Sequence, residues 1–203
     1  MPLKAKPRSK ANSPAGALRL SYRPVTEDRW DDLVELFGSN GGCAGCWCMW
    51  WRLPRARWVA GKGQGNRRAL RRIVERGAVP GLLAYEGGEP VGWVAVEPRE
   101  AYAGLDRSRT LARVDDQPVW SVPCFFVARS HRGKGVTRAL LEAAARFARS
   151  RGARIVEGYP VEYRGGVADA WVFTGAASTF RKAGFREVAR RSPTRPILRK
   201  AVR

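Results

Sequence analysis

Apolar residues recur along the chain with two periods, and the shorter one predicts a set of β-strands. Short runs rich in valine, leucine and aromatic residues are bounded by glycine, proline or polar clusters, as is typical of strands. These runs lie at residues 18–24, 81–85, 90–96, 119–128, 153–161, 185–189 and 196–201. Residues 86–89, Glu-Gly-Gly-Glu, have the chemistry of a hairpin turn, so the second and third runs should pair antiparallel.

The longer period predicts four helices. Apolar positions three and four residues apart lie at residues 26–37, 66–76, 136–149 and 176–183. Thr26 should cap the first helix, and Gly184 should end the last. The third helix lies between two predicted strands, which makes a β-α-β unit. The order of elements predicts an α+β domain with mixed strand directions, covering residues 18–203.

The junction between the strand that ends at Ala128 and the following helix carries the clearest functional signal. Residues 132–137 read Arg-Gly-Lys-Gly-Val-Thr, a glycine-rich turn with two cations. The first amides of a helix have no partners within it and attract anions, and glycine lets the backbone approach a ligand closely. The turn therefore predicts a pyrophosphate site.

This turn resembles the signature of the GNAT superfamily of N-acetyltransferases, Arg/Gln-x-x-Gly-x-Gly/Ala, with Thr137 where glycine or alanine is usual. The order of elements after Leu18 is also similar to the GNAT fold. The resemblance implies a mixed, mostly antiparallel central sheet with helices on both faces, a β-α-β phosphate-binding unit, and acetyl-CoA between splayed fourth and fifth strands. The implied cofactor-binding residues are Phe126, Val127, Ala128, Arg132, Gly133, Lys134, Gly135, Val136 and Thr137.

The resemblance implies an N-acyltransferase that moves an acyl group, most simply acetyl from acetyl-CoA, to a primary amine of a small molecule by direct attack. Many members place a tyrosine four residues before the Gly-Phe that follows the last helix, where it acts as general acid. Phe180 stands at that position here. Side chains that could supply an acid or a base instead are Glu97, Glu157, Tyr159 and Ser178.

The cysteine- and tryptophan-rich segment 43–51 lies where GNAT proteins line their acceptor site, and the thioester should point toward residues 120–124. The resulting acceptor-pocket candidates are Cys46, Trp47, Trp50, Trp51, Trp120 and Cys124. Aromatic walls there would suit a ring-bearing substrate or a stacked base. Tryptophans at helical spacing are more often core, and the cysteines lack a paired zinc knuckle, so we predict reduced thiols and no metal.

Charge raises a second set of hypotheses. The chain has 38 Lys+Arg against 18 Asp+Glu, a formal charge of +20 that attracts polyanions. Arg67, Arg68, Arg71 and Arg72 should share one face of the helix at 66–76 and could bind RNA or form an ordinary solvated face. The alternatives to an acyl-CoA enzyme are therefore a GNAT-fold transferase that uses aminoacyl-tRNA as acyl donor, and a non-catalytic nucleic-acid-binding module.

The N-terminal segment and the overall composition suggest in which cellular compartment the protein lies. Residues 1–17 are basic and lack a hydrophobic segment, so we expect a disordered arm and a cytoplasmic protein. No apolar run approaches the length of a membrane span. A length of 203 residues fits one domain with a full core. The sequence leaves the amine acceptor and the oligomeric state open.

Overall fold

The computed structural model describes residues 18–163 and 173–203, and these form one sheet with the strand order β1-β2-β3-β4-β5-β7-β6. All neighbouring strands are antiparallel except β4 and β5, which are parallel. The expected basic arm at residues 1–17 lies outside the described residues. The strands are β1 Leu20–Pro24, β2 Gly81–Glu86, β3 Glu89–Pro98, β4 Trp120–Val127, β5 Ile155–Gly158, β6 Arg186–Arg190 and β7 Pro196–Ala201.

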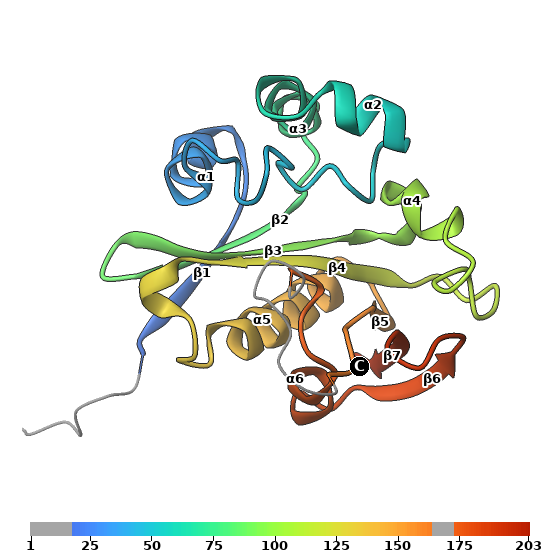
Figure 1. Ribbon diagram of the computed structural model, residues 1–203. Helices are drawn as coiled ribbons and strands as arrows, with labels where there is room; N and C mark the ends of the chain where they lie inside the picture. Colours follow the sequence, from blue (N-terminus) through green and yellow to red (C-terminus); the bar gives the residue numbers. More distant parts are fainter. Residues whose placement is uncertain (1–17, 164–172) are drawn as a thin grey trace, which may run out of the picture.

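Helices cover both faces of this sheet, as predicted. Figure 1 shows α1, α2, α3 and α4 above the sheet and α5 and α6 below it. The helices are α1 Trp30–Phe37, α2 Arg55–Ala60, α3 Gln64–Glu75, α4 Ala103–Asp106, α5 Val136–Ser150 and α6 Ala177–Lys182. None of the described helices is long and apolar enough to cross a lipid bilayer.

Alternation along β3 builds a hydrophobic core on each side of the sheet. Trp93 faces α1 and α3 and packs with Leu33 and Leu70, whereas Val94 faces α5 and packs with Leu140. All five side chains are buried. The central strand is therefore covered on both faces, which holds β3 and its neighbour β4 firmly in place.

Two short helices, α2 and α4, form in segments for which the sequence analysis predicted neither a helix nor a strand. Helix α2 begins directly after Pro54, and the buried side chain of Asn66 holds its far end by donating to the carbonyl of Trp58 at 3.2 Å. Helix α4 packs its backbone against the 43–53 segment, where the Gly104 amide donates to the carbonyl of Trp51 at 2.7 Å. Helix α4 depends on a contact with a distant segment, and α2 on a side chain of the next helix, so neither has a signal within its own residues.

The predicted cap at Thr26 is wrong in detail. Its hydroxyl donates to Asp28 at 2.5 Å, and a 3-10 turn at Glu27–Arg29 precedes α1, with no side-chain cap on either element. The arginine-rich helix starts two residues before the predicted position, and its Leu70 and Val74 are buried as expected.

Candidate functional site

Strands β4 and β5 separate at the centre of the sheet. They pair over three positions, from Trp120 opposite Val156 to Val122 opposite Gly158. Strand β5 ends there, whereas β4 continues to Val127. The edge of β4 beyond Val122 therefore faces no β5 partner, and a gap opens toward α5.

A cavity of about 700 Å³ lies along this gap. It joins the exposed part of β4 to the glycine-rich turn and is closed by residues from the segment after α1 and from the C-terminal region. Its lining comprises Gly42, Cys43, Phe125, Phe126, Val127, His131, Arg132, Gly133, Gly135, Val136, Thr137, Arg138, Phe173 and Thr179. Seven of the nine predicted cofactor residues are among them; Ala128 and Lys134 lie outside the lining.

The turn has the geometry of an anion site. Gly133 and Gly135 have φ angles of 75° and 81°, in the left-handed region that favours glycine, and a Cβ on either would meet no atom within 4 Å. Ala139 donates the first hydrogen bond of α5, to the carbonyl of Gly135. The amides of residues 136–138 thus precede the helical ladder and are available to a phosphate.

The histidine in this turn is fixed to the neighbouring hairpin. His131 Nε2 lies 2.8 Å from Glu86 Oε2, and its Nδ1 lies 2.9 Å from the Ser130 hydroxyl. The imidazole is 16% exposed. This contact ties the start of the turn to the end of β2.

A β-bulge determines which face of the sheet each side chain of β4 joins. Opposite Val96, β4 has two residues, Val122 and Pro123, so the register shifts by one. Proline has no N–H to donate to the sheet, which suits a bulge. As a result Trp120 packs on α5 with its ring 6.0 Å from that of Phe147, whereas Cys124 belongs to the opposite core. The structure does not bring these two predicted acceptor residues together.

The other acceptor candidates also lie in different parts of the molecule. Trp47 is 4% exposed and stacks on Trp30 with ring centroids 6.0 Å apart, so it is part of the core. Cys46 is largely buried, and burial raises the pKa of its thiol. Trp50 and Trp51 line a second cavity of about 290 Å³ between α2 and α4.

The buried thiol of Cys48 contacts the partly buried thiol of Cys124. A hydrogen bond to Cys48, together with burial, holds the pKa of Cys124 well above its usual value, and the same hydrogen bond lowers the pKa of Cys48. Cys48 Sγ also accepts from Trp93 Nε1 at 3.1 Å. Across residues 18–163 and 173–203, no three His, Cys, Asp or Glu side chains converge as metal ligands.

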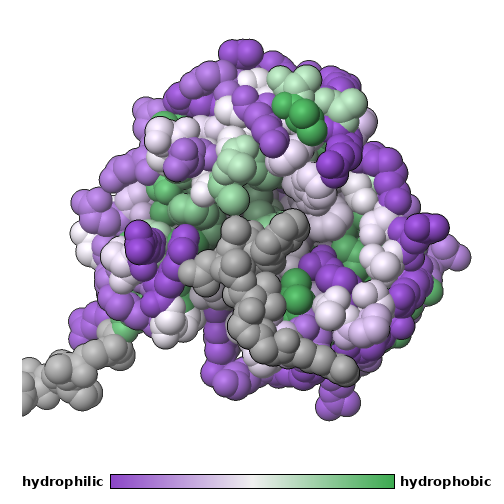
Figure 2. Space-filling view, viewed as in Figure 1, coloured by the Kyte–Doolittle hydropathy of each residue, from purple (hydrophilic) through white to green (hydrophobic). Residues whose placement is uncertain are grey.

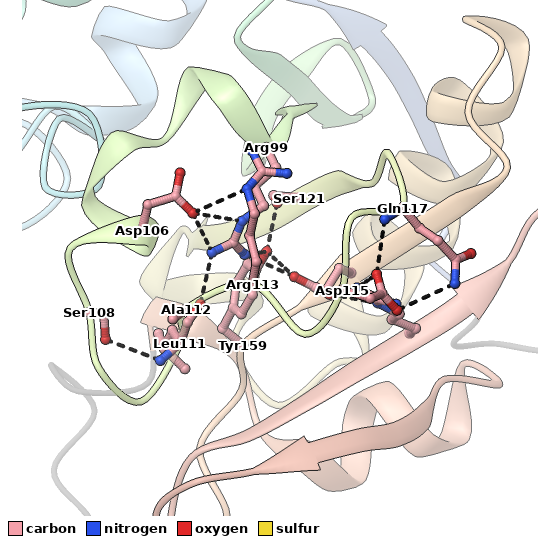
Figure 3. A network of polar contacts seen from close by, with 12 residues as sticks. Arg99, Asp106, Ser108, Leu111, Ala112, Arg113, Asp115, Gln117, Ser121 and Tyr159 are labelled. Atoms are coloured by element: carbon pink, nitrogen blue, oxygen red, sulfur yellow. Dashed lines mark hydrogen bonds and ion pairs between the residues drawn. The ribbon is translucent and has the colours of Figure 1, made fainter.

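Two predicted catalytic residues lie inside a buried polar network. Glu157 accepts from Arg99 Nη1 at 3.0 Å, from the Tyr159 hydroxyl at 2.6 Å and from Arg199 Nε at 2.6 Å. The Tyr159 hydroxyl also lies 2.7 Å from that of Ser121, and burial raises its pKa well above the usual value. Figure 3 shows Arg99, Tyr159 and Ser121 converging within this network. The network lies beside the three-residue β4–β5 pairing and outside the cavity lining.

The remaining two catalytic candidates have different surroundings. Glu97 forms a largely buried ion pair with Arg52, which also stacks over the ring of Tyr102 at 4.5 Å. Ser178 is exposed on α6, whereas the next residue, Thr179, lines the cavity. Phe180 is buried against Gly158, where a Cβ would come within 2.0 Å of its ring.

The four arginines of α3 do not share one exposed face, because two lie over tryptophan rings and two are exposed to solvent. Arg67 lies over Trp47 at 5.4 Å and Arg71 over Trp30 at 5.1 Å, so both guanidinium groups rest on core tryptophans. Arg68 and Arg72 are exposed. In Figure 2 the surface at the top, over α2 and α3, is mostly hydrophilic with small apolar patches.

Sequence reasoning did not place Cys43, Phe125 or Phe173 at the site. Cys43 and Phe173 come from segments far from the turn, and only the three-dimensional fold brings them to the cavity. Phe125 alternates with Phe126 on β4, and both line the cavity because the gap between the strands exposes each face.

Comparison with known proteins gives the same family that the glycine-rich turn indicated. The sequence profile of the acetyltransferase (GNAT) family matches residues 47–160, more than half of the chain. Among solved structures, PaiA N-acetyltransferase from Thermoplasma acidophilum in complex with coenzyme A has 11% identity and a TM-score of 0.53, covering 91% of this chain and 99% of that one.

Two further structures give similar values. The GNAT domain of S. lividans PAT has 20% identity and a TM-score of 0.54, covering 94% of this chain and 99% of that one. A GNAT-family acetyltransferase from Streptococcus agalactiae has 13% identity and a TM-score of 0.54, covering 91% and 96%. No curated protein matches the chain. At these identities the structural matches concern the fold, and that fold is the one expected from the sequence.

Proposed function

The chain belongs to the GNAT acetyltransferase family, and from the geometry of its site we propose that it transfers an acetyl group from acetyl-CoA to the primary amine of a small molecule. The observation that carries the proposal is the cavity of about 700 Å³ that links the β4–β5 gap to the glycine-rich turn. Its open turn and elongated lining suit a ligand with a pyrophosphate at one end and a narrow arm at the other. When bound, acetyl-CoA supplies an acetyl group activated as a thioester.

Each part of the cavity has a distinct task in this proposal. The amides of residues 136–138 bind the pyrophosphate, with Arg132 and Arg138 nearby to balance its charge. The unpaired edge of β4 beyond Val122 offers backbone groups to the amides of the pantetheine arm. Phe125, Phe126 and Phe173 supply apolar walls that exclude water from the reacting end.

Proton transfer needs a group other than the tyrosine usual in the family, because Phe180 has no hydroxyl. Three side chains of the cavity lining carry an O–H or S–H group: Cys43, Thr137 and Thr179, of which Thr137 lies in the phosphate-binding turn. We assign proton transfer to Thr179, since it precedes Phe180 on α6 and faces the cavity. Glu157 and Tyr159, buried in their network, instead fix the base of the gap.

The direct test is an acetylation assay with a panel of primary amines. We expect acetyl-CoA to be consumed with release of free coenzyme A thiol, and one amine to gain the mass of an acetyl group. Hydrolysis of acetyl-CoA at the background rate with every amine, together with no binding of acetyl-CoA in a calorimetric titration, would contradict the proposal.

Aminoacyl-tRNA is a second candidate donor, and one observation favours it. Arg68 and Arg72 project from α3 and form no ion pair within the described part of the chain. Their charges are therefore available to a polyanion. If tRNA is the donor, Arg68→Glu with Arg72→Glu should abolish salt-sensitive tRNA binding. The same charge change at exposed Arg149 and Arg154, on the α5 side, should leave it intact.

A further inference from the structure

Two cysteines that are distant in the sequence meet on one face of the sheet. Cys48 lies in the segment between α1 and α2, and Cys124 lies on β4. Both are free cysteines, and the thiol of Cys124 donates a hydrogen bond to the sulfur of Cys48. Because the two sulfur atoms are already in contact, a disulfide between them requires little movement of the backbone.

The register of the sheet fixes the positions of both thiols. Cys124 lies opposite Ala95 in the β3–β4 pairing, and Trp93, two positions earlier on β3, faces the same core as Ala95. Trp93 Nε1 donates to Cys48 Sγ at 3.1 Å. Cys48 therefore rests on the same part of the sheet from which Cys124 projects.

The backbone at Cys48 has an unusual conformation that supports this contact. Trp47 and Cys48 have φ angles of 46° and 52°, in the left-handed region that residues with a side chain rarely adopt. This turn stacks the ring of Trp47 on Trp30 and brings Cys48 Sγ to Trp93. Packing in the core thus holds the thiol of Cys48 in place.

One thiol of the pair is suited to act as a nucleophile. The hydrogen bond from Cys124, the N–H of Trp93 and the charge of Arg52 favour the thiolate of Cys48 and lower its pKa, although burial acts in the opposite direction. The hydrogen bond to Cys48 and burial keep the pKa of Cys124 well above its usual value, so Cys124 retains its proton. A thiolate beside a second thiol is the arrangement in which oxidation by a peroxide ends in a disulfide.

The pair is accessible to a small oxidant. Cys124 belongs to the part of β4 beyond Val122 that has no β5 partner, and it is partly exposed. Cys48, in contact with it, is 8% exposed. The residual exposure of Cys124 admits a molecule as small as hydrogen peroxide.

We propose that Cys48 and Cys124 are a redox modification site, which hydrogen peroxide converts to a disulfide and thiol reductants restore. The thiolate of Cys48 attacks one peroxide oxygen, the O–O bond breaks, and the departing hydroxide is protonated by solvent, which leaves Cys48 as a sulfenic acid. The sulfur of Cys124 then attacks that of Cys48, the S–O bond breaks, and the second hydroxide takes the proton of Cys124. The two thiols lose two electrons and two protons, and the peroxide is reduced to two molecules of water.

The disulfide joins two parts of the wall of the larger cavity, which we call the donor cavity. Gly42 and Cys43 line this cavity and belong to the same segment as Cys48, whereas Phe125 and Phe126 line it from β4, directly after Cys124. A cross-link between residues 48 and 124 restricts the unfolded chain, so the urea midpoint should rise on oxidation and fall again on reduction. The proposal goes beyond acetyl transfer and does not depend on it.

The test treats the whole chain with hydrogen peroxide, blocks the remaining thiols and digests the protein with trypsin. Cys43, Cys46 and Cys48 all lie on the fragment 30–52, and Cys124 lies on the fragment 114–129. We expect these two fragments to be joined, the intact protein to lose the mass of two hydrogen atoms, and a dithiol reductant to separate the fragments again. Unjoined fragments, with Cys48 either left as a thiol or oxidised to a sulfinic or sulfonic acid, would overturn the proposal.

Matched variants identify which cysteine of the fragment 30–52 takes part. Cys48→Ser should lower the yield of joined fragments about tenfold or more, whereas Cys46→Ser, which removes a neighbouring thiol whose pKa is raised by burial, should change the yield less than about twofold. Serine at position 48 keeps an acceptor for the N–H of Trp93, and circular dichroism checks that the variant folds. Full yield in Cys48→Ser, or its loss in Cys46→Ser alone, would overturn the assignment.

A second variant and a stability measurement complete the test. Cys124→Ser changes the partly exposed member of the pair and leaves the 43–53 segment intact, so loss of the joined fragments there does not depend on how Cys48→Ser folds. The urea midpoint of the wild type should rise after oxidation, and that of Cys124→Ser should stay where it was. Full yield in Cys124→Ser, or an unchanged midpoint in fully joined wild-type protein, would contradict the proposal.

Discussion

Arg99 and Glu157 form a salt bridge in which Arg99 Nη1 lies 3.0 Å from Glu157 Oε1 and each side chain is 1% exposed. The remaining N–H groups of Arg99 reach Asp106, Tyr159 and the carbonyl of Leu111. A buried guanidinium with this many partners fastens the segment after β3 to β5. The pair therefore sets the position from which β4 and β5 diverge.

Removal of Arg99 should be strongly destabilising. Arg99→Met leaves the carboxylate of Glu157 with one fewer charged partner in the core, which costs about 3–5 kcal/mol in comparable buried pairs. Arg113→Met is the matched control, because Arg113 is 37% exposed and its partner Glu100 is 64% exposed. The control should lose about 1 kcal/mol or less. Urea unfolding of both variants measures the difference, and equal midpoints would contradict the buried role of Arg99.

Acid should remove stability through Glu162. Hydrogen bonds from Arg181 and then Arg190 lower the pKa of Glu162 to about 2. Because its folded-state pKa is depressed, its contribution is complete above the unfolded pKa of about 4.5 and is lost as the pH falls toward 2. Glu162→Gln should thus be less stable than the wild type at pH 7, by about 1 kcal/mol or less after solvent screening, and equal to it near pH 2.

The control for Glu162 is Glu89→Gln, at an exposed hairpin residue that forms no ion pair within residues 18–163 and 173–203. Its unfolding free energy should follow the wild-type curve across the same pH range. Parallel curves for Glu162→Gln and the wild type between pH 7 and pH 2 would show that the two arginines do not stabilise the charged carboxylate.

Thiol labelling should report on donor binding at Cys43. Cys43 is exposed and lines the donor cavity, whereas Cys48 is buried and Cys46 and Cys124 are partly buried. In the native protein Cys43 should react first with a thiol reagent, and saturating acetyl-CoA should slow its reaction about tenfold or more by covering it. Mass spectrometry of the labelled peptides gives both rates. An unchanged rate at Cys43 with acetyl-CoA bound would place the donor elsewhere.

A hydroxyl at position 179 should matter for turnover. Thr179→Val keeps the shape of the side chain and removes the O–H group, so kcat should fall about 10- to 100-fold while acetyl-CoA affinity is retained. Ser178→Ala, at the neighbouring exposed position, should leave kcat unchanged. Loss of activity in Ser178→Ala with full activity in Thr179→Val would reverse the assignment.

Local signals in the sequence were sufficient to predict the strands, the main helices and the glycine-rich turn before α5. The turn was predictable because its glycines, its cations and the helix that follows are adjacent in the chain. The faces of β4 were not predictable from alternation alone, because the bulge at Val122 and Pro123 shifts the period by one. Pro123 in an otherwise β-prone run was the available signal.

The surroundings of the candidate catalytic residues were not predictable from the sequence. Glu157 and Tyr159 lie near a strand end, as a catalytic carboxylate or phenol would, but their partners Arg99 and Arg199 are 58 and 42 residues away from Glu157. Burial by such distant partners has no signature in the local pattern. The assignment of Trp50 and Trp51 to a cavity, and of Trp47 to the core, likewise required the packing around them.

The most direct test of the account is acetyl-CoA binding to a pair of glycine variants. Gly135 and Gly152 both have left-handed backbones, with φ of 81° and 87°, and a Cβ on either meets open space, but only Gly135 lines the donor cavity. Leucine at either position costs about 1–2 kcal/mol in backbone strain. Calorimetry should show that Gly135→Leu weakens acetyl-CoA binding at least tenfold while Gly152→Leu binds as the wild type does. Equal affinities in the two variants would contradict a donor site at the glycine-rich turn.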